Sequence, residues 1–330
     1  MDERALKLHM DALVCDCHSD SMLRALKGEN LNLRSNQGHL DFPRMREGGV
    51  DLEVFACWVD PKIPRGEYIK RALSIMDAFF RQIEASSGEV IHARTADEII
   101  GAKSQGKLAA VLAVEGGHAI DNSIEVLRIY HKLGVRIMTL TWNNSNDWAD
   151  SAVNPKPEGG LTDFGREVVR EMNRIGMIVD ISHVSDKTFW DALETSDDPI
   201  IASHSSARAL CDHPRNMTDE MIRALARKGG VVFVNFYPRY LTKHTGGTDP
   251  PRVTVKRIIE HVQHIVDLVG ADHVGLGSDF DGLPKLPEGI EDCTKMPTIT
   301  ELLLEKGFSE EEIRKILGEN FLRVFREVCS

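Results

Sequence analysis

Residues 14–20 contain the residue types of a metal site, in the order Val-Cys-Asp-Cys-His-Ser-Asp. If this segment is a strand, its side chains alternate between faces, so Asp16, His18 and Asp20 point one way and the intervening cysteines point the other. A neutral imidazole and a carboxylate two residues apart at a strand end can bind one divalent metal ion. The alternative is a strand end whose polar residues enter a loop.

Further polar side chains follow other apolar runs of the chain, and these are Glu115, His183, His204, Asp279 and Asp281. Each has a simpler explanation when taken alone: a carboxylate at a helix start, a capping or core histidine, or an aspartate in a turn. Together they lie where parallel strands of a barrel would end, which is where barrel enzymes carry their active sites. With His18 and Asp20, the histidines and carboxylates form a ligand set for two metal ions.

The elements that would position these residues alternate between apolar β-branched runs and amphipathic stretches, a pattern typical of a parallel sheet. The predicted strands are 12–17, 50–58, 108–114, 135–140, 177–181, 200–203, 231–235 and 274–277. Helical spacing of apolar residues lies between most of them, at 67–84, 124–133, 163–175, 186–193, 219–228 and 253–269. We therefore predict a (β/α)8 TIM-type barrel.

The remaining segments complete this prediction. The stretches 31–46, 154–160 and 244–251 are interpreted as loops over the barrel, and 301–306 and 309–328 as extra C-terminal helices that pack on its outside. No composition shift divides the chain, so we expect one metal-dependent hydrolase domain over residues 1–330.

The composition argues against a nucleic-acid-binding protein and a membrane-spanning protein. The 330 residues carry 51 acidic against 40 basic side chains, a net charge of -11, which argues against a nucleic-acid partner. We find no secretory signal and no apolar run approaching ~18 residues, so we expect no membrane span. The six cysteines are scattered through a large chain, which favours reduced thiols and a cytoplasmic location.

The combined motifs resemble the renal or membrane dipeptidase family, zinc hydrolases built on amidohydrolase-like barrels. The segments that carry the resemblance occur in family order: Asp16-x-His18-x-Asp20, 113–117, 136–141, 148–150, 181–185, 203–206, 215–216, 234–237, 277–282 and 320–325. The resemblance implies two Zn²⁺ per chain. It implies that His18 and Asp20 hold one ion, that His183 and His204 hold the other, and that Glu115 bridges them.

The same resemblance assigns roles to further residues. Arg215 matches the arginine that binds the terminal carboxylate of a small dipeptide substrate, and Tyr240 is expected to line the substrate pocket. Asp279 matches the carboxylate that moves the proton after a metal-bridging hydroxide attacks the peptide bond. The family also tolerates a D-residue at the C-terminal position of the dipeptide, and we expect the same here.

One position departs from the family pattern. Mammalian members have a histidine after Thr-Leu-Thr that polarises the substrate carbonyl, whereas this chain has Trp142. An indole N–H donates one hydrogen bond but carries no charge and does not titrate. Either Asn143 or Asn144 supplies the donor, or the metal acts alone, or the substrate differs.

The sequence leaves two other readings open. The first is a related binuclear-metal hydrolase that acts on N-acyl amino acids, cyclic amides or lactones. The second is a non-catalytic barrel that binds a metal or a partner protein. A homodimer is compatible with the sequence, which does not decide the oligomeric state.

Overall fold

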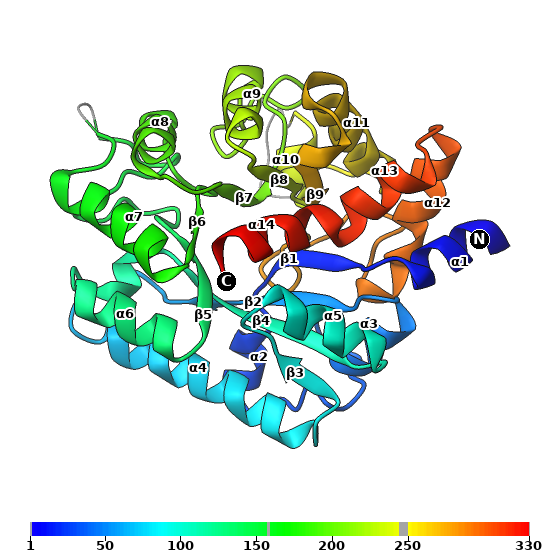
Figure 1. The fold of residues 1–330 in the computed structure, drawn as a ribbon, viewed down its shortest axis with the longest axis horizontal. Coiled ribbons are helices and arrows are strands. Elements are labelled where there is room, and N and C mark those ends of the chain that lie inside the picture. Colours follow the sequence, from blue (N-terminus) through cyan, green and yellow to red (C-terminus); the bar gives the residue numbers. More distant parts are fainter. Residues whose placement is uncertain (1, 157–158, 244–249, 330) are drawn as a thin grey trace.

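A computed structural model describes residues 2–156, 159–243 and 250–329. Parallel strands form a barrel in the order β1-β2-β4-β5-β6-β7-β8-β9 (Figure 1). Their bounds are β1 Cys15–Ser19, β2 Leu52–Trp58, β4 Leu108–Glu115, β5 Val135–Thr139, β6 Ile178–Asp180, β7 Ile201–Ser205, β8 Val231–Val234 and β9 Val274–Leu276. The ring closes beyond the ends of β1 and β9, where Asp20 N donates to Phe280 O (2.8 Å) and Asp279 N to His18 O (3.0 Å).

These barrel strands confirm all eight predicted strands and the predicted fold class. One further strand, β3 (Val90–His92), pairs in parallel with the first residues of β4 and lies outside the barrel order. It was not predicted, because three residues are too few for an alternating pattern to stand out.

Helices surround the strands (Figure 1). They are α1 Glu3–Asp11, α2 Met22–Leu26, α3 Phe42–Glu47, α4 Tyr68–Ala85, α5 Ala96–Ser104, α6 Ile124–Lys132, α7 Asp163–Ile175, α8 Asp186–Thr195, α9 Asp219–Arg227, α10 Pro238–Leu241, α11 Lys256–Val269, α12 Pro297–Glu305, α13 Glu310–Arg314 and α14 Asn320–Val328. Every predicted helix is present.

The loop prediction for 31–46 is partly wrong, because α3 begins inside that segment. Asp41 caps α3 by accepting a hydrogen bond from Arg44 N, and Pro43 occupies its first turn, where a missing N–H costs nothing. In the other two predicted loops, residues 157–158 and 244–249 lie outside the described part of the chain. Helix α5 was missed although Thr95 and Glu98 form a capping box at its start.

Alternate residues of β4 pack on opposite sides of the barrel wall. Leu112 and Val114 belong to the large apolar core that includes the outer helices, whereas Val111 and Ala113 belong to a second cluster of buried residues. This second cluster joins the inward faces of several strands to α14. The last helix therefore covers the end of the barrel where the strands begin (Figure 1), rather than packing on the outside as predicted.

Two further findings bear on the class of protein. Within the described residues, no helix has both the length and the apolar character needed to cross a lipid bilayer. All six cysteines are described, and each is buried with a free thiol.

Candidate metal centre and active site

The predicted ligands come together at the end of the barrel where the strands finish. His18, Glu115 and His204 lie in the last residues of β1, β4 and β7. Asp20 lies just beyond β1, and His183 follows β6. Because parallel strands of a barrel end on one rim, residues far apart in the sequence converge there.

Two β-bulges aim the histidines of β1 and β7. From Asp16 to Ser19, β1 advances three positions while β2 advances only two, and β7 shows the same mismatch against β8 between Ala202 and Ser205. An extra residue changes which side chains face inward, a device common beside active sites. The rings of His18 and His204 lie side by side with centroids 3.9 Å apart and their planes tilted by 35°.

The prediction that Asp16, His18 and Asp20 point the same way is wrong for Asp16, because the bulge interrupts the alternation of side chains. The carboxylate of Asp16 does not join His18 and Asp20. Instead it accepts hydrogen bonds from the backbone N–H (2.7 Å) and the hydroxyl of Ser278, and so anchors the turn before Asp279. Strict alternation would have kept the three side chains together, and the inserted residue breaks it.

Three imidazoles converge on Glu115. Its Oε1 lies 2.9 Å from His183 Nε2, 3.5 Å from His204 Nε2 and 3.7 Å from His18 Nε2. Burial lowers the pKa of all three histidines, that of His18 to about 3, with the charge of Arg215 contributing. The rings are therefore neutral near pH 7, and neutral imidazole is the form that binds a metal.

A second group of ligand atoms adjoins the first. His18, Asp20 and Asp279 each offer one atom, and these atoms lie within 4.8 Å of one another, as do those of His18, Glu115 and His204. The buried atoms His18 Nε2 and Asp20 Oδ1 have no hydrogen-bond partner among the described residues. Burial raises the pKa of Asp20 and Glu115. Divalent cations fit this set, since they would satisfy these atoms and offset the crowded carboxylates.

Hydrogen bonds to Nδ1 orient two of the candidate ligand histidines. Ser203 Oγ donates to Asp180 Oδ2 (2.6 Å) and lies 2.8 Å from His204 Nδ1. With its own proton given to Asp180, the hydroxyl accepts from Nδ1–H, which leaves Nε2 of His204 unprotonated. His183 Nδ1 lies 2.9 Å from Asn143 Oδ1, an acceptor, so its Nε2 is also free for a metal.

Asp180 lies in the predicted strand 177–181 and Ser203 in the motif segment 203–206, but neither was predicted to have a role. Their signal was a carboxylate inside the buried apolar run of β6 and a hydroxyl directly before a ligand histidine. Neither of these signals shows that the two residues are hydrogen-bonded to each other, because Asp180 and Ser203 are 23 residues apart and meet only when β6 and β7 pair.

Asp279 lies beside the cluster in a constrained backbone. Its φ of 64° is in the left-handed region, which is uncommon for a residue other than glycine. Burial raises the pKa of Asp279 to about 6, although Asn235 Nδ2 donates to its Oδ2 (3.0 Å) and Arg215 lies near. A carboxyl with such a pKa can both accept and release a proton near neutrality.

Arg215 is buried, with 3% of its surface exposed, and forms no ion pair with the described residues. Its Nη2 donates to His204 O (3.2 Å), its Nε has no hydrogen-bond partner in the described part of the chain, and its guanidinium lies 5.3 Å from the centre of the Tyr240 ring. A buried cation that forms no direct ion pair within the described part of the chain is suited to bind an anionic group of a ligand.

A cavity of about 290 Å³ adjoins the candidate metal ligands. Asp20, Glu115, Asp279 and Asp281 form its acidic part, and His183, Asn143 and Tyr240 also line it. Its apolar part was not predicted and consists of Leu23, Trp58, Trp142, Tyr237, Leu283 and Pro284. The rings of Trp58 and Trp142 meet edge to face, with centroids 5.0 Å apart.

A parallel α/β barrel with histidines and carboxylates on its rim defines a metal-dependent hydrolase. The sequence pattern of the membrane dipeptidase family, peptidase family M19, matches residues 2–330, so the chain belongs to this family. The protein is a metallo dipeptidase, as the sequence predicted.

Individual relatives agree with this assignment. Dipeptidase tcpJ of Claviceps purpurea is 40% identical over 302 residues, covering 88% of this chain and 69% of the relative. The uncharacterized dipeptidase C965.12 of Schizosaccharomyces pombe is 37% identical over 347 residues, covering 98% and 82%. A metallo peptidase from Rhodobacter sphaeroides, solved with a phosphinate mimic of the dipeptide L-Ala-D-Ala, superposes with a TM-score of 0.89 at 29% identity, covering 96% of this chain and 99% of the other.

Proposed function

We propose that residues 1–330 form one hydrolase domain that cleaves dipeptides at a centre of two Zn²⁺ ions. His18, Asp20, Glu115, His183 and His204 would hold the ions. One observation carries the proposal: the three imidazole Nε2 atoms lie within 3.7 Å of Glu115 Oε1. Glu115 lines a cavity that is also lined by Tyr240, and the buried guanidinium of Arg215 lies against the Tyr240 ring. Imidazole and carboxylate together are a ligand set that suits zinc.

The positions of the side chains suggest which group performs each part of the proposed reaction. Two zinc ions, when bound, supply an activated water and polarise the scissile carbonyl. Asp279 accepts the proton of the attacking water and passes it to the leaving amine, as general base and then general acid. Glu115, whose Oε1 lies 2.9 Å from His183 Nε2 and 3.5 Å from His204 Nε2, would help to hold both ions.

Three residues bind the substrate in this proposal. Arg215 binds the free carboxylate at the C-terminal end of the dipeptide, and the ring of Tyr240 beside it helps to fix the guanidinium. Asn143 turns its Oδ1 to His183, and its Nδ2 has no hydrogen-bond partner among the described residues. We assign this N–H group to the substrate carbonyl, in place of the histidine that Trp142 replaces.

Tolerance of a D-residue at the C-terminal position is part of the proposal. The relative from Rhodobacter sphaeroides was solved with a mimic of L-Ala-D-Ala, at 29% identity to this chain. A carboxylate fixed by Arg215 at a set distance from the metal ligands selects for dipeptide length more than for the configuration of the last residue.

The test is a dipeptide library with L- and D-residues at each position, assayed on zinc-loaded and chelator-treated protein. We expect hydrolysis only with metal bound, about two zinc ions per chain by metal analysis, and cleavage of L,D as well as L,L dipeptides. Full activity in metal-free protein would contradict the proposal.

The apolar wall formed by Trp58 and Trp142 favours a second candidate, a hydrolase of N-acyl amino acids. Such substrates keep the carboxylate that Arg215 would bind but replace the charged amino group with an apolar acyl chain. Adding N-acyl amino acids to the library separates the two functions, because only one class should be cleaved efficiently.

A further inference from the structure

The loop that carries Arg215 depends on a second arginine. This loop spans 207–217 after β7, and its ends meet in a bridge between Ala207 and Met217. Arg208, near its start, donates from Nε to Asn216 O (2.8 Å) and from Nη2 to Pro214 O (3.4 Å). These two carbonyls belong to the residues on either side of Arg215. The guanidinium of Arg208 therefore holds the backbone from which the side chain of Arg215 extends.

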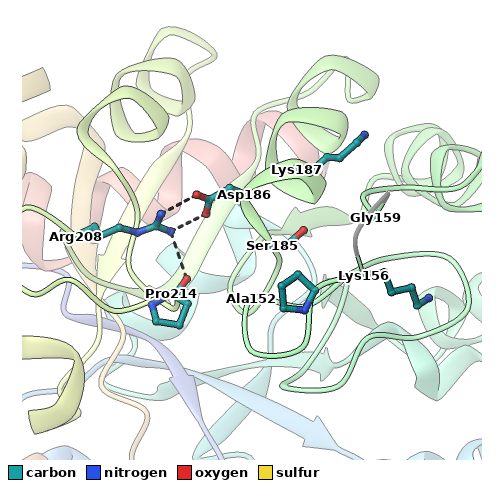
Figure 2. A pocket seen from close by; sticks show the side chains of 9 residues that line it. Ala152, Lys156, Gly159, Ser185, Asp186, Lys187, Arg208 and Pro214 are labelled. Carbon is teal, nitrogen blue, oxygen red and sulfur yellow. Dashed lines mark hydrogen bonds and ion pairs between the residues drawn. The ribbon is translucent and has the colours of Figure 1, made fainter.

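Arg208 is itself held by a carboxylate from the next part of the rim. Its Nη1 and Nη2 donate to the two oxygens of Asp186 at 2.7 and 2.6 Å, as Figure 2 shows. Asp186 is the first residue of α8, three positions after His183. The pair therefore ties the loop of Arg215 to the chain segment of a metal ligand. A guanidinium that binds a carboxylate through two nitrogens has a fixed orientation, which the single ammonium group of a lysine cannot reproduce.

Neither member of this pair lies in the cavity that adjoins the candidate metal ligands. Arg208 and Asp186 line a different, outward cavity of about 330 Å³, whose lining residues include neither Asp279 nor any of the metal ligands. Any effect that they have on a substrate in that cavity is therefore indirect, and the hydrogen bonds of Arg208 lead to the backbone on either side of Arg215. The guanidinium of Arg215 has only one hydrogen bond within the described residues and one ring contact, with Tyr240, so few other contacts fix its position if the backbone of its loop moves.

We propose that Arg208, locked by Asp186, is a positioning residue that places Arg215 for the substrate carboxylate. The proposal rests on the function proposed above. A displacement of a binding group by about 1 Å is enough to weaken a productive interaction strongly. The side chain of Asp186 is 49% exposed, and partly exposed ion pairs add little to folding stability, so the pair can be broken without unfolding the chain.

The experiment compares Arg208→Gln and Asp186→Asn with the wild-type enzyme. For a dipeptide substrate, we expect KM to rise about tenfold in both variants with kcat nearly unchanged, because binding geometry and not the reacting groups is altered. The same dipeptide with an amidated C-terminus should show an unchanged KM, or an unchanged Ki if it is not cleaved. Asp186→Glu should restore part of the affinity, whereas Arg208→Lys should not.

A double variant separates positioning from a general structural role. In an Arg215→Met background, Arg208→Gln should raise KM no further, since the group that it positions is gone. The matched control is Arg128→Gln, which breaks the ion pair of Arg128 with Glu171 between α6 and α7, and it should leave KM unchanged. Circular dichroism and zinc content establish that each variant is folded.

The outcomes distinguish the two proposals. An active wild-type enzyme with an unchanged KM in Arg208→Gln would overturn the positioning role alone. Equal losses for the free and amidated dipeptides, or additive losses in the double variant, would overturn it as well. A folded, zinc-loaded wild-type protein that cleaves no dipeptide would overturn the proposed function and this inference with it.

Discussion

At the scale of single residues, the site is built where the backbone departs from regular geometry. His183, Asp279 and Asp281 have φ values of 70°, 64° and 66°, all in the left-handed region. Such a conformation costs roughly 1–3 kcal/mol for a residue other than glycine and persists only where surrounding contacts enforce it. Here the enforcing contacts include the hydrogen bonds of Asp16 to Ser278 and of Asn235 to Asp279.

Asp279→Asn tests the proton transfer. We expect kcat to fall by roughly 10²–10⁴-fold, because the amide cannot accept the proton, while its similar shape keeps the site intact. Steady-state kinetics and metal analysis on the same preparation check this. A variant that loses zinc would show that Asp279 is a ligand instead, and one that retains its kcat would exclude the role.

Ser203→Ala tests the orientation of His204. Removal of the hydroxyl breaks the link between Asp180 and His204 Nδ1, and we expect zinc affinity to fall roughly 10–100-fold, the usual effect of losing such a partner. Competition with a chelator measures it. Ser206→Ala is the matched control, since its buried hydroxyl has no hydrogen-bond partner in the described residues, and its affinity should match the wild type.

At the scale of elements, α14 closes the barrel at the end opposite the site. Phe321 is buried against Phe233 of β8, with ring centroids 6.1 Å apart, and stacks on Phe325 at 5.3 Å. These contacts join the last helix of the chain to the inward face of the barrel. Helix α14 therefore stabilises the ring without touching the cavity that adjoins the candidate metal ligands.

Phe321→Ala separates this structural role from catalysis. We expect a loss of roughly 3–5 kcal/mol in the free energy of unfolding, the usual cost of emptying a large aromatic site in a core. Urea denaturation measures it. Arg326→Ala, at an exposed position of the same helix, should change stability by less than about 0.5 kcal/mol. In the folded fraction of Phe321→Ala, kcat should be unchanged; a reduced value would link α14 to the site.

At the scale of the whole molecule, buried histidines outside the metal site make stability depend on pH. Burial lowers the pKa of His9, His92 and His261 to about 4, from an unfolded value of 6.5. Between these values the unfolded chain binds protons that the folded chain excludes. The stabilisation is therefore complete above pH 6.5 and is lost as the pH falls toward 4.

His9→Gln isolates one of these contributions. His9 bonds to Thr300 Oγ1 at 2.7 Å and to Gly48 O at 2.8 Å, and its pKa shift corresponds to on the order of 3 kcal/mol across the full range. Urea unfolding at pH 7.5 and pH 5.0 should show a smaller pH-dependent loss in the variant than in the wild type. All other titrating groups cancel in that difference, so equal losses would contradict the assignment.

The amino-acid sequence by itself determined the barrel strands and the residues that meet at their ends. Apolar runs, their alternation with amphipathic stretches and the histidine or carboxylate that follows several of these runs are properties of short segments. They identify His18, Glu115, His183 and His204 before any contact is known. The predicted direction of the Asp16 side chain was wrong, because whether a strand carries a bulge depends on the neighbouring strand with which it pairs.

Tertiary structure alone decided which side chains support the site. Asp180 accepts a hydrogen bond from Ser203, and Asp186 accepts one from Arg208, although the two residues of each pair are more than twenty positions apart in the sequence. The same holds for α14, whose amphipathic pattern fixes an apolar face but not the barrel end that it covers. Local periodicity sets which way a side chain points within its element, whereas its partner depends on how separate elements pack, and no single segment encodes that.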